Sequence, residues 1–253
     1  MEATSDRPAI ALVCCGLIGT LVADDGLLER AYAEAIATQG VVSGTSAFAR
    51  RMSQVHQGRG HAPADVLGGL FPDNEARAQA AELAFNRSLA DGLARSVIRP
   101  VPGARPAVEN LLSAGCDVAV LTSLPRRILQ RVLDAAGLRK LPAVSLSVDD
   151  VARGFPAPDL VLTAFLRAGA GDVRQIVVVN STGAGVEAGR RAGAGVVAGV
   201  LTGPHPAARL RRAGATDVLP SIADLAELLL GRSAPATVSI PPQARLERSP
   251  AKR

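Results

Sequence analysis

Aromatic residues are scarce in this sequence, which has no tryptophan, one tyrosine and five phenylalanines among 253 residues. Proteins that bind single-stranded nucleic acid stack the bases on aromatic side chains, so this scarcity counts against that class. The net charge is +5 and the sequence pI about 9.8, but the basic residues are spread along the chain. Only two of them are lysines, Lys140 and Lys252, and the others are arginines. We therefore expect no nucleic-acid partner.

Cysteines and long hydrophobic runs are also scarce. Cys14, Cys15 and Cys116 are too few for a disulfide framework. No apolar run reaches the roughly 18 residues that a membrane span needs. Glu2 and Asp6 precede the first apolar stretch, where a signal peptide would carry basic residues. These features predict a cytoplasmic protein without a membrane partner, and a hydrophobic content of 48% excludes a wholly disordered chain.

Short apolar runs alternate with helical patterns over most of the chain. Continuous apolar runs between helices are typical of strands buried on both faces of a parallel sheet. Several of the helical patterns begin near a proline and stop at a glycine, as helices commonly do. The predicted strands are 10–15, 117–121, 144–148, 176–179 and 195–201, and the helices that follow this rule are 106–114, 125–136 and 158–168.

One segment interrupts this alternation. From about residue 25 to 96 only helical patterns occur, at 27–39, 46–57, 62–70 and 74–94. A structureless loop of that length is rare, so the segment is predicted to be an inserted α-helical cap. The predicted class is α/β, with a Rossmann-like parallel sheet core formed by residues 8–24 and 97–230. The Pro-, Arg- and Ser-rich tail, 231–253, is predicted to be disordered.

Four stretches, in this order, resemble motifs of the haloacid dehalogenase-like (HAD) superfamily, and most closely its phosphonoacetaldehyde hydrolase, or phosphonatase-like, branch. The first resembles D-x-A-G-T-T, the third G-[K/R]-P-x-P and the fourth V-G-D-T-x-x-D-x-x-A-G. The resemblance covers about residues 8 to 230 and implies the same fold, and in an active relative it implies Mg²⁺-assisted hydrolysis. The stretches are 13–26, 99–123, 154–160 and 177–189.

The resemblance fails at the residues that carry the chemistry. Gly16 occupies the position of the nucleophilic aspartate, and glycine has no side chain to attack with. Ile18 stands where phosphatases of the family carry an acid/base aspartate. Phe155 replaces a lysine or arginine, and Ser181 and Gly185 replace the two acids that hold Mg²⁺, a cation that prefers carboxylate oxygen. We therefore predict that no catalytic residue and no metal site remain at these positions, and no cofactor.

Some motif residues are kept. Thr20, Thr122, Ser123 and Thr182 are predicted to be a remnant of a ligand- or phosphate-binding site, with a helix cap or turn as the alternative role for Thr122. In the cap, the stretch 51–56 resembles the phosphonatase motif M-G-x-x-K. It places His56 where those enzymes carry the lysine that forms a Schiff base, so His56 is expected at the cap cleft.

Three other features of the sequence could suggest a different chemistry. Cys14 and Cys15 adjoin the lost nucleophile, but buried structural thiols are the favoured interpretation. His56, His61 and Asp65 have a spacing that only faintly resembles a zinc site, because glycines interrupt the helix between the histidines. The stretch Gly183–Ala188 matches G-x-G-x-x-A, the dinucleotide-binding fingerprint, although it comes late in the chain and no acid for a ribose follows.

Three functions follow from the sequence. The first is a pseudoenzyme with the HAD-like hydrolase fold that has a binding or regulatory role, with an unidentified small molecule or protein as ligand. The second is a weak or re-purposed hydrolase of a small phosphorylated or phosphonate metabolite, and the third is a dinucleotide-binding module. Phosphonatase-like caps often take part in dimer contacts, so the resemblance also raises a homodimer as an expectation.

Overall fold

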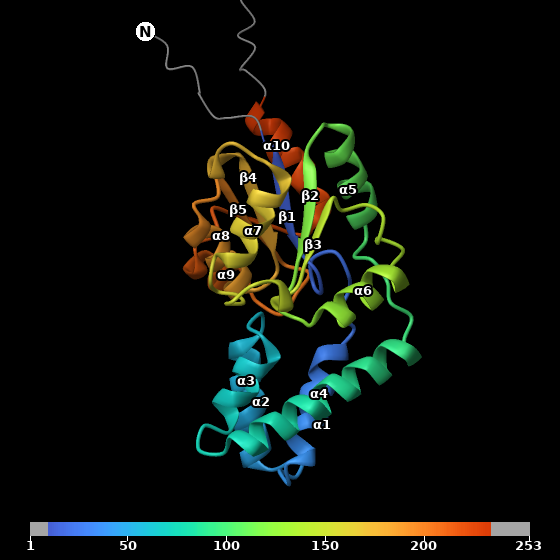
Figure 1. Cartoon of the computed structure of the whole chain (residues 1–253), viewed down its shortest axis with the longest axis vertical. Helices are drawn as coiled ribbons and strands as arrows, with labels where there is room; N and C mark the ends of the chain where they lie inside the picture. The colour runs from blue at the N-terminus through green and yellow to red at the C-terminus, as the bar shows by residue number, and fades with distance from the viewer. Residues whose placement is uncertain (1–9, 234–253) are drawn as a thin grey trace, which may run out of the picture.

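A parallel β-sheet forms the centre of the larger half of the molecule (Figure 1). The computed structural model describes residues 10–233, and within them the strand order is β3-β2-β1-β4-β5-β6, with all pairs parallel. This confirms the predicted α/β, Rossmann-like fold. The strands are β1 (Leu12–Gly16), β2 (Asp117–Leu121), β3 (Val144–Leu146), β4 (Ile176–Asn180), β5 (Val196–Val200) and β6 (Asp217–Leu219).

Helices cover both faces of the sheet because its central strands are apolar on both sides. Within β1, Leu12 and Cys14 pack among residues of one helical layer, whereas Val13 and Cys15 pack among those of the other. The first layer contains α7 (Asp159–Ala168), α8 (Gly183–Ala192) and α9 (Ala207–Ala213), and the second contains α5 (Ala104–Ser113), α6 (Arg126–Ala135) and α10 (Leu225–Ser233). Chain order reverses between β1 and β4, and such a switch point is where open α/β sheets bind ligands.

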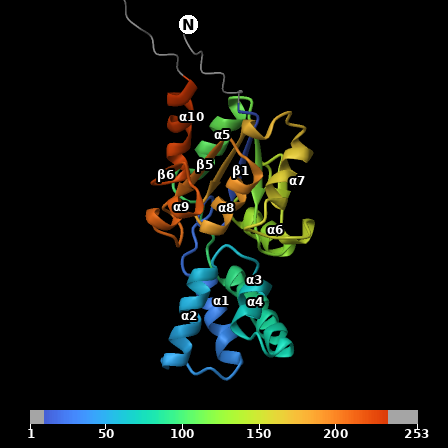
Figure 2. The same cartoon turned by 90° about the vertical axis from the view of Figure 1, so that its left-hand side faces the viewer.

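Four helices lie together beyond the carboxyl ends of the strands (Figures 1 and 2). They are α1 (Leu27–Thr38), α2 (Ser46–Gly58), α3 (Pro63–Leu70) and α4 (Glu75–Arg95). Thr45 caps the start of α2, and Asn74 caps the start of α4, each with its side-chain oxygen. Tyr32 of α1 packs against Phe85 of α4 with ring centroids 4.4 Å apart. These helices fill the segment predicted to be the cap, and we call them the cap below.

The elements differ from the sequence prediction in three places. The strand predicted over 144–148 stops at Leu146, because the Ser147 hydroxyl and the Asp150 carboxylate form a capping box that turns the chain into a short 3₁₀ helix. The elements α9, β6 and α10 were missed, and seven and three residues in α9 and β6 carry little periodicity. The tail prediction is wrong for 231–233, which belong to α10, and residues 234–253 lie outside the described part.

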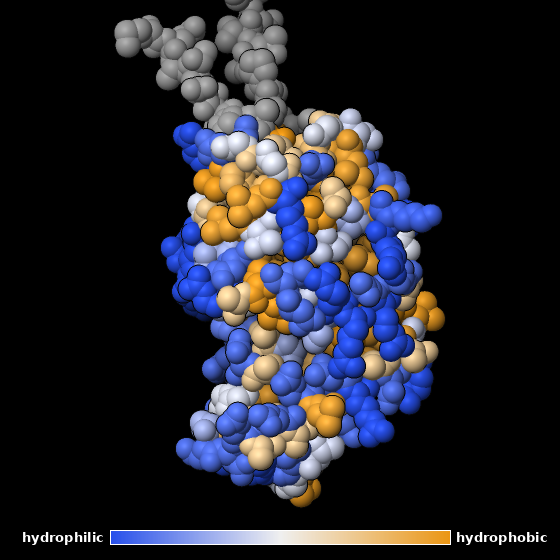
Figure 3. Space-filling model, viewed as in Figure 1, coloured by the Kyte–Doolittle hydropathy of each residue, from blue (hydrophilic) through white to orange (hydrophobic). Residues whose placement is uncertain are grey.

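The surface is largely hydrophilic on the face shown in Figure 3, with hydrophobic residues in small scattered groups. Within 10–233 the exposed large hydrophobic residues are spread over both halves of the molecule: Val42, Leu83, Val97, Leu166 and Leu201. None of the helices in that range is long and apolar enough to cross a membrane.

Candidate active site

A small cavity of about 60 Å³ lies where the cap meets the carboxyl ends of β1, β2 and β4. The core contributes Ile18, Thr122, Ser123, Phe155, Asn180 and Thr182 to its lining, and the cap contributes Leu28, Tyr32, Arg59, Gly60 and His61. The cavity therefore brings together most of the positions singled out from the sequence. Two of them, Gly16 and Gly185, lie beside it and have no side chain.

The Asn180 side chain fills the space between Gly16 and Gly185. A Cβ atom added at Gly16 would lie 2.7 Å from Asn180 Nδ2, and one added at Gly185 would lie 2.2 Å from Asn180 Cγ. Asn180 is buried, and its Oδ1 accepts hydrogen bonds from the Thr182 N–H (3.0 Å) and hydroxyl (2.9 Å). Side chains at positions 16 and 185 are therefore incompatible with Asn180 as it is held here.

The kept hydroxyl groups all have partners within the protein. Thr20 is fully buried, and its Oγ1 accepts from the Ser181 N–H at 3.1 Å. Thr122 Oγ1 accepts from the Leu124 N–H, so the turn role applies to it in this structure. The Thr182 hydroxyl caps α8 by accepting from the Gly185 N–H at 3.2 Å. Thr20 is not in the cavity lining, so the predicted remnant is divided between the cavity and the core.

Phe155, which stands where the family's third motif has a lysine or arginine, forms an apolar wall of the cavity. Phe155 is 4% exposed, lines the cavity and packs with β-strand residues such as Leu121. A neighbouring cation does not replace the missing charge, since the Arg153 side chain is largely exposed and forms a two-point ion pair with Asp159, at 2.9 and 3.1 Å.

The cap closes over the cavity through the loop that follows α2. The Ser123 hydroxyl donates to the Gly60 carbonyl at 2.8 Å, and Gly60 lies directly against Thr182. Arg59 is 6% exposed and pairs with Asp24, whose other carboxylate oxygen accepts from the Leu28 N–H at the start of α1. The Arg59 charge is therefore already compensated within the protein.

Tyr32 brings a hydroxyl group to the same cavity. The residue is 3% exposed, and within 10–233 its hydroxyl has no hydrogen-bond partner in the protein. Burial raises the pKa of this phenol, so it remains a neutral donor. A partner inside the cavity, such as a water molecule or a small polar ligand, would satisfy it.

His205, from the loop after β5, joins the core to the cap. Its Nδ1 accepts from the Gly183 N–H at 2.8 Å, which leaves Nε2 to donate to the His56 carbonyl at 3.2 Å. Arg209 donates to the same carbonyl and to that of Gln57. These bonds hold the carboxyl end of α2 against the start of α8.

The His56 side chain does not lie where the sequence predicts. It is about half exposed, approaches Glu29 at 3.4 Å and is not part of the cavity lining. Position 56 lies near the end of α2 and faces α1 at the surface, so only its backbone carbonyl takes part in the contact between cap and core.

Lowering the pH should destabilise the folded protein through protonation of His205. Burial and then the nearby Arg209 guanidinium lower the pKa of this imidazole from 6.5 to about 4. Between these values the unfolded chain binds a proton that the folded chain does not, so the free energy of unfolding falls as pH falls from about 6.5 to about 4. The loss amounts to roughly 1–3 kcal/mol. Urea unfolding at pH 7 and pH 4 measures it, and His205→Gln, which keeps a donor and an acceptor, should flatten the dependence by that amount. An equally steep dependence in His205→Gln would contradict this assignment.

The family model for haloacid dehalogenase-like hydrolases matches residues 10–193. The chain belongs to the haloacid dehalogenase-like hydrolase family. Over 106 residues it is 36% identical to a phosphonoacetaldehyde hydrolase of Bordetella pertussis, a match that covers 42% of this chain and 38% of that protein. The matched region thus spans less than two fifths of that relative's length.

Solved structures of similar fold agree with this assignment. A hydrolase from Pseudomonas syringae has a TM-score of 0.76 and 23% identity, and the match covers 88% of this chain and 98% of that one. A phosphonoacetaldehyde hydrolase-like protein from Oleispira antarctica has a TM-score of 0.77 and 20% identity, with 91% and 95% covered. At these identities the likeness establishes the fold, which is the HAD fold.

The Mg²⁺ that the family implies does not fit the residues present here. None of Gly16, Ser181 and Gly185 offers a carboxylate, and the Asn180 amide occupies the volume between the two glycines. The Ser181 hydroxyl is already directed to the Ile18 carbonyl, at 3.4 Å. Within residues 10–233 no group of three or more His, Cys, Asp or Glu side chains is placed to hold a metal ion, so His56, His61 and Asp65 do not form one.

The other two chemistries also find little support. Cys14 and Cys15 are completely buried, and burial raises the pKa of Cys15 to about 12 and also raises that of Cys14, so neither is a thiolate at neutral pH. At the dinucleotide-like stretch, the Gly183 and Gly185 N–H groups that would meet a pyrophosphate already donate to His205 and Thr182.

Sequence reasoning missed Asn180, Tyr32, Arg59 and His205. Asn180 had a usable signal, because it stands at the glycine of V-G-D-T, so a bulky residue appears where the motif has none. Tyr32, Arg59 and His205 had no such signal in the sequence, since their role depends on how the cap packs against the core.

Proposed function

We propose that this member of the HAD family is a pseudoenzyme that neither hydrolyses phosphomonoesters nor cleaves phosphonates, and that it has a binding or regulatory role. The observation that carries the proposal is the Asn180 side chain between Gly16 and Gly185. The chain has lost the nucleophile, and the vacated space has been taken by a buried side chain that makes two hydrogen bonds of its own. The space that a nucleophile and a metal would need is therefore no longer free.

The cleft supports a binding role of limited scope. Its cavity of about 60 Å³ has room for a few water molecules or one small polar molecule, and Tyr32 offers it an unpartnered hydroxyl. The Bordetella relative is named for the hydrolysis of phosphonoacetaldehyde, but the residues that this chain carries at the motif positions do not support that reaction.

We expect no turnover above the buffer blank when the purified protein is given Mg²⁺ with phosphonoacetaldehyde or with a panel of phosphomonoesters. The readouts are released phosphate and released aldehyde. Turnover that co-purifies with the protein, and that a single substitution removes, would overturn the proposal.

A positive control can be built from the chain itself. Gly16→Asp/Ser181→Asp/Gly185→Asp restores the family's acids, but it places two side chains against Asn180. We expect this triple variant to fold poorly, and the further change Asn180→Gly to recover part of its thermal stability, because a Cβ atom at position 16 would still lie 2.8 Å from Thr20 Oγ1. The recovered variant then tests Mg²⁺ binding by calorimetry, a readout that does not depend on catalysis. The native chain should show no Mg²⁺ binding in the same experiment.

A further inference from the structure

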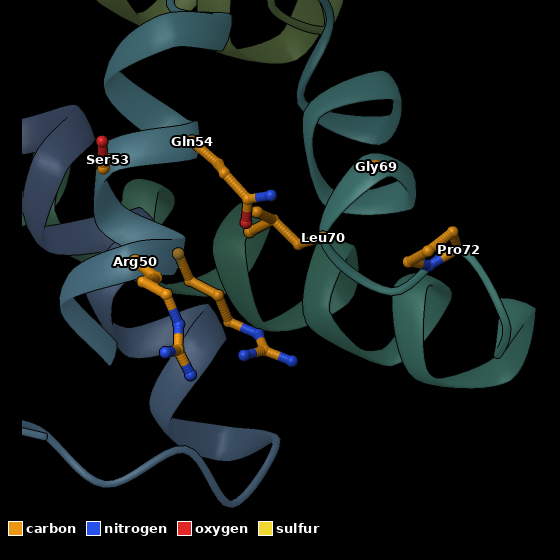
Figure 4. Close-up of a pocket in the computed structure, with 7 residues that line it drawn as sticks. Arg50, Ser53, Gln54, Gly69, Leu70 and Pro72 are labelled. Carbon is orange, nitrogen blue, oxygen red and sulfur yellow. The ribbon is translucent and has the colours of Figure 1, made fainter. Parts of the chain in front are cut away.

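A second pocket lies in the cap, on the side of α2 that faces the end of α3 (Figure 4). Arg50, Arg51, Ser53 and Gln54 form one wall, and Gly69, Leu70 and Pro72 form the other. Its volume is about 470 Å³, within the range of roughly 300–1,000 Å³ that small-molecule sites have. It shares no lining residue with the cleft cavity, so it is a separate site.

The pocket carries positive charge that no acid of the described chain balances. The helix α2 contains no aspartate or glutamate. Within 10–233, neither Arg50 nor Arg51 has a carboxylate within 4 Å. Glu75, at the nearby start of α4, accepts instead from Gln79. Two neighbouring guanidinium groups without an acid partner in the described part of the chain therefore line the same pocket.

Arg51 is held in place although its hydrogen bonds are not satisfied. Its guanidinium lies over the Phe71 ring at 5.2 Å from the centroid, and Arg77 lies over the same ring at 4.7 Å. The Arg51 Nε atom is buried and has no partner. Because Nε has almost no exposed surface, only the outer guanidinium nitrogens of Arg51 can meet a ligand, and acceptor oxygens would suit those donors.

We propose that this cap pocket binds a phosphomonoester through Arg50 and Arg51, with the rest of the ligand lying along Gln54, Leu70 and Pro72. A phosphomonoester carries close to two negative charges at neutral pH, which matches two unpaired guanidinium groups, and its oxygens suit their forked donors. The pocket volume accommodates a molecule the size of a nucleoside monophosphate, and the apolar wall of Leu70 and Pro72 suits a planar body. The proposal does not depend on the cleft being inactive.

Calorimetric titration of the full chain with AMP, and separately with inorganic phosphate, tests the site. AMP is expected to bind more tightly than phosphate. Arg50→Gln should weaken AMP binding about tenfold, because one charge-assisted contact is lost, and Arg50→Gln/Arg51→Gln should weaken it about a hundredfold or abolish it. The matched control is Arg87→Gln/Arg95→Gln, which removes the same charge from exposed positions of α4 and should leave AMP binding unchanged.

Several results would overturn the proposal. One is the absence of AMP binding up to about 10 mM, where even a millimolar Kd gives measurable heat. A second is AMP binding that both double variants weaken equally, which would indicate a general charge effect. A third is phosphate binding as tight as AMP binding, which would exclude a role for the apolar wall. Because Arg51 also packs on Phe71, a far-UV spectrum and a thermal melt accompany each variant, and Arg50→Gln, at an exposed position, decides the matter if the double variant unfolds.

Discussion

Gly185→Ala should destabilise the protein by about 1–3 kcal/mol, although alanine is the better helix former. Gly185 lies in the first turn of α8, and the new Cβ atom would meet three atoms of the Asn180 side chain at 2.2–2.6 Å. Asn180 cannot simply rotate away, because the Thr182 N–H and hydroxyl would lose their acceptor in a buried place. The free energy of unfolding, measured with urea, gives the loss.

The same substitution should reverse its sign when Asn180 is absent. In an Asn180→Gly background the three nearest atoms are gone, so we expect Gly185→Ala to be neutral or slightly stabilising through its helix propensity. The double-mutant cycle should therefore give a coupling energy of about 1–3 kcal/mol between positions 180 and 185. An additive result would mean that Asn180 does not occupy this space.

Gly183→Ala is the matched control for this cycle. Position 183 starts the same helix, but a Cβ atom there would have its nearest neighbours at 3.6 Å, which is an ordinary contact. Its effect should stay within about 0.5 kcal/mol and should not depend on Asn180.

The fold was predictable from the sequence because its signals are local. The buried strands β2 and β4 are apolar over nearly their whole length, and the cap helices repeat their apolar residues with helical spacing over 12 or 21 residues. The motif order then identified the family. What local signals could not predict were the short edge strand β6 and the end of β3, where three residues and a capping box decide the structure.

The sequence predicts which catalytic residues the candidate site lacks, but it does not predict which side chains fill it. The losses at Gly16, Ser181 and Gly185 are visible once the motifs are aligned. The position of Asn180 between Gly16 and Gly185 could not be predicted, because residues 16 and 185 are far apart in the chain and meet only in the folded structure. His205 joins the start of α8 to His56, a residue 149 positions away, and no periodicity or motif reports such a contact.

Gly60→Ala should have a large effect on the cap, with an expected loss of about 3 kcal/mol or more in the free energy of unfolding. Two independent costs add at this position. Its φ of +101° lies in a region that residues with a Cβ atom rarely adopt. The Cβ atom would also lie 2.4 Å from Thr182 Oγ1 and 2.8 Å from Thr182 Cβ, so the loop could not stay against the core.

Gly44→Ala separates these two costs. Gly44 belongs to the same cap and has a φ of +83°, but a Cβ atom there would have no neighbour within 4 Å. Its loss should be limited to the backbone term of about 1–2 kcal/mol. Any further decrease in the free energy of unfolding in Gly60→Ala measures the contact between cap and core.

Hydrogen exchange locates where the extra loss arises. In Gly60→Ala the Ser123 hydroxyl loses the Gly60 carbonyl, and the bonds from His205 and Arg209 to the end of α2 are strained with it. Amides of the loop 59–61 and of the start of α8 should then exchange faster than in the native chain, whereas Gly44→Ala should leave them unchanged. Equal exchange at those amides in both variants would show that the cap loop is not held by its contact with Thr182, and the cavity beneath it would then be open to solvent in the native protein as well.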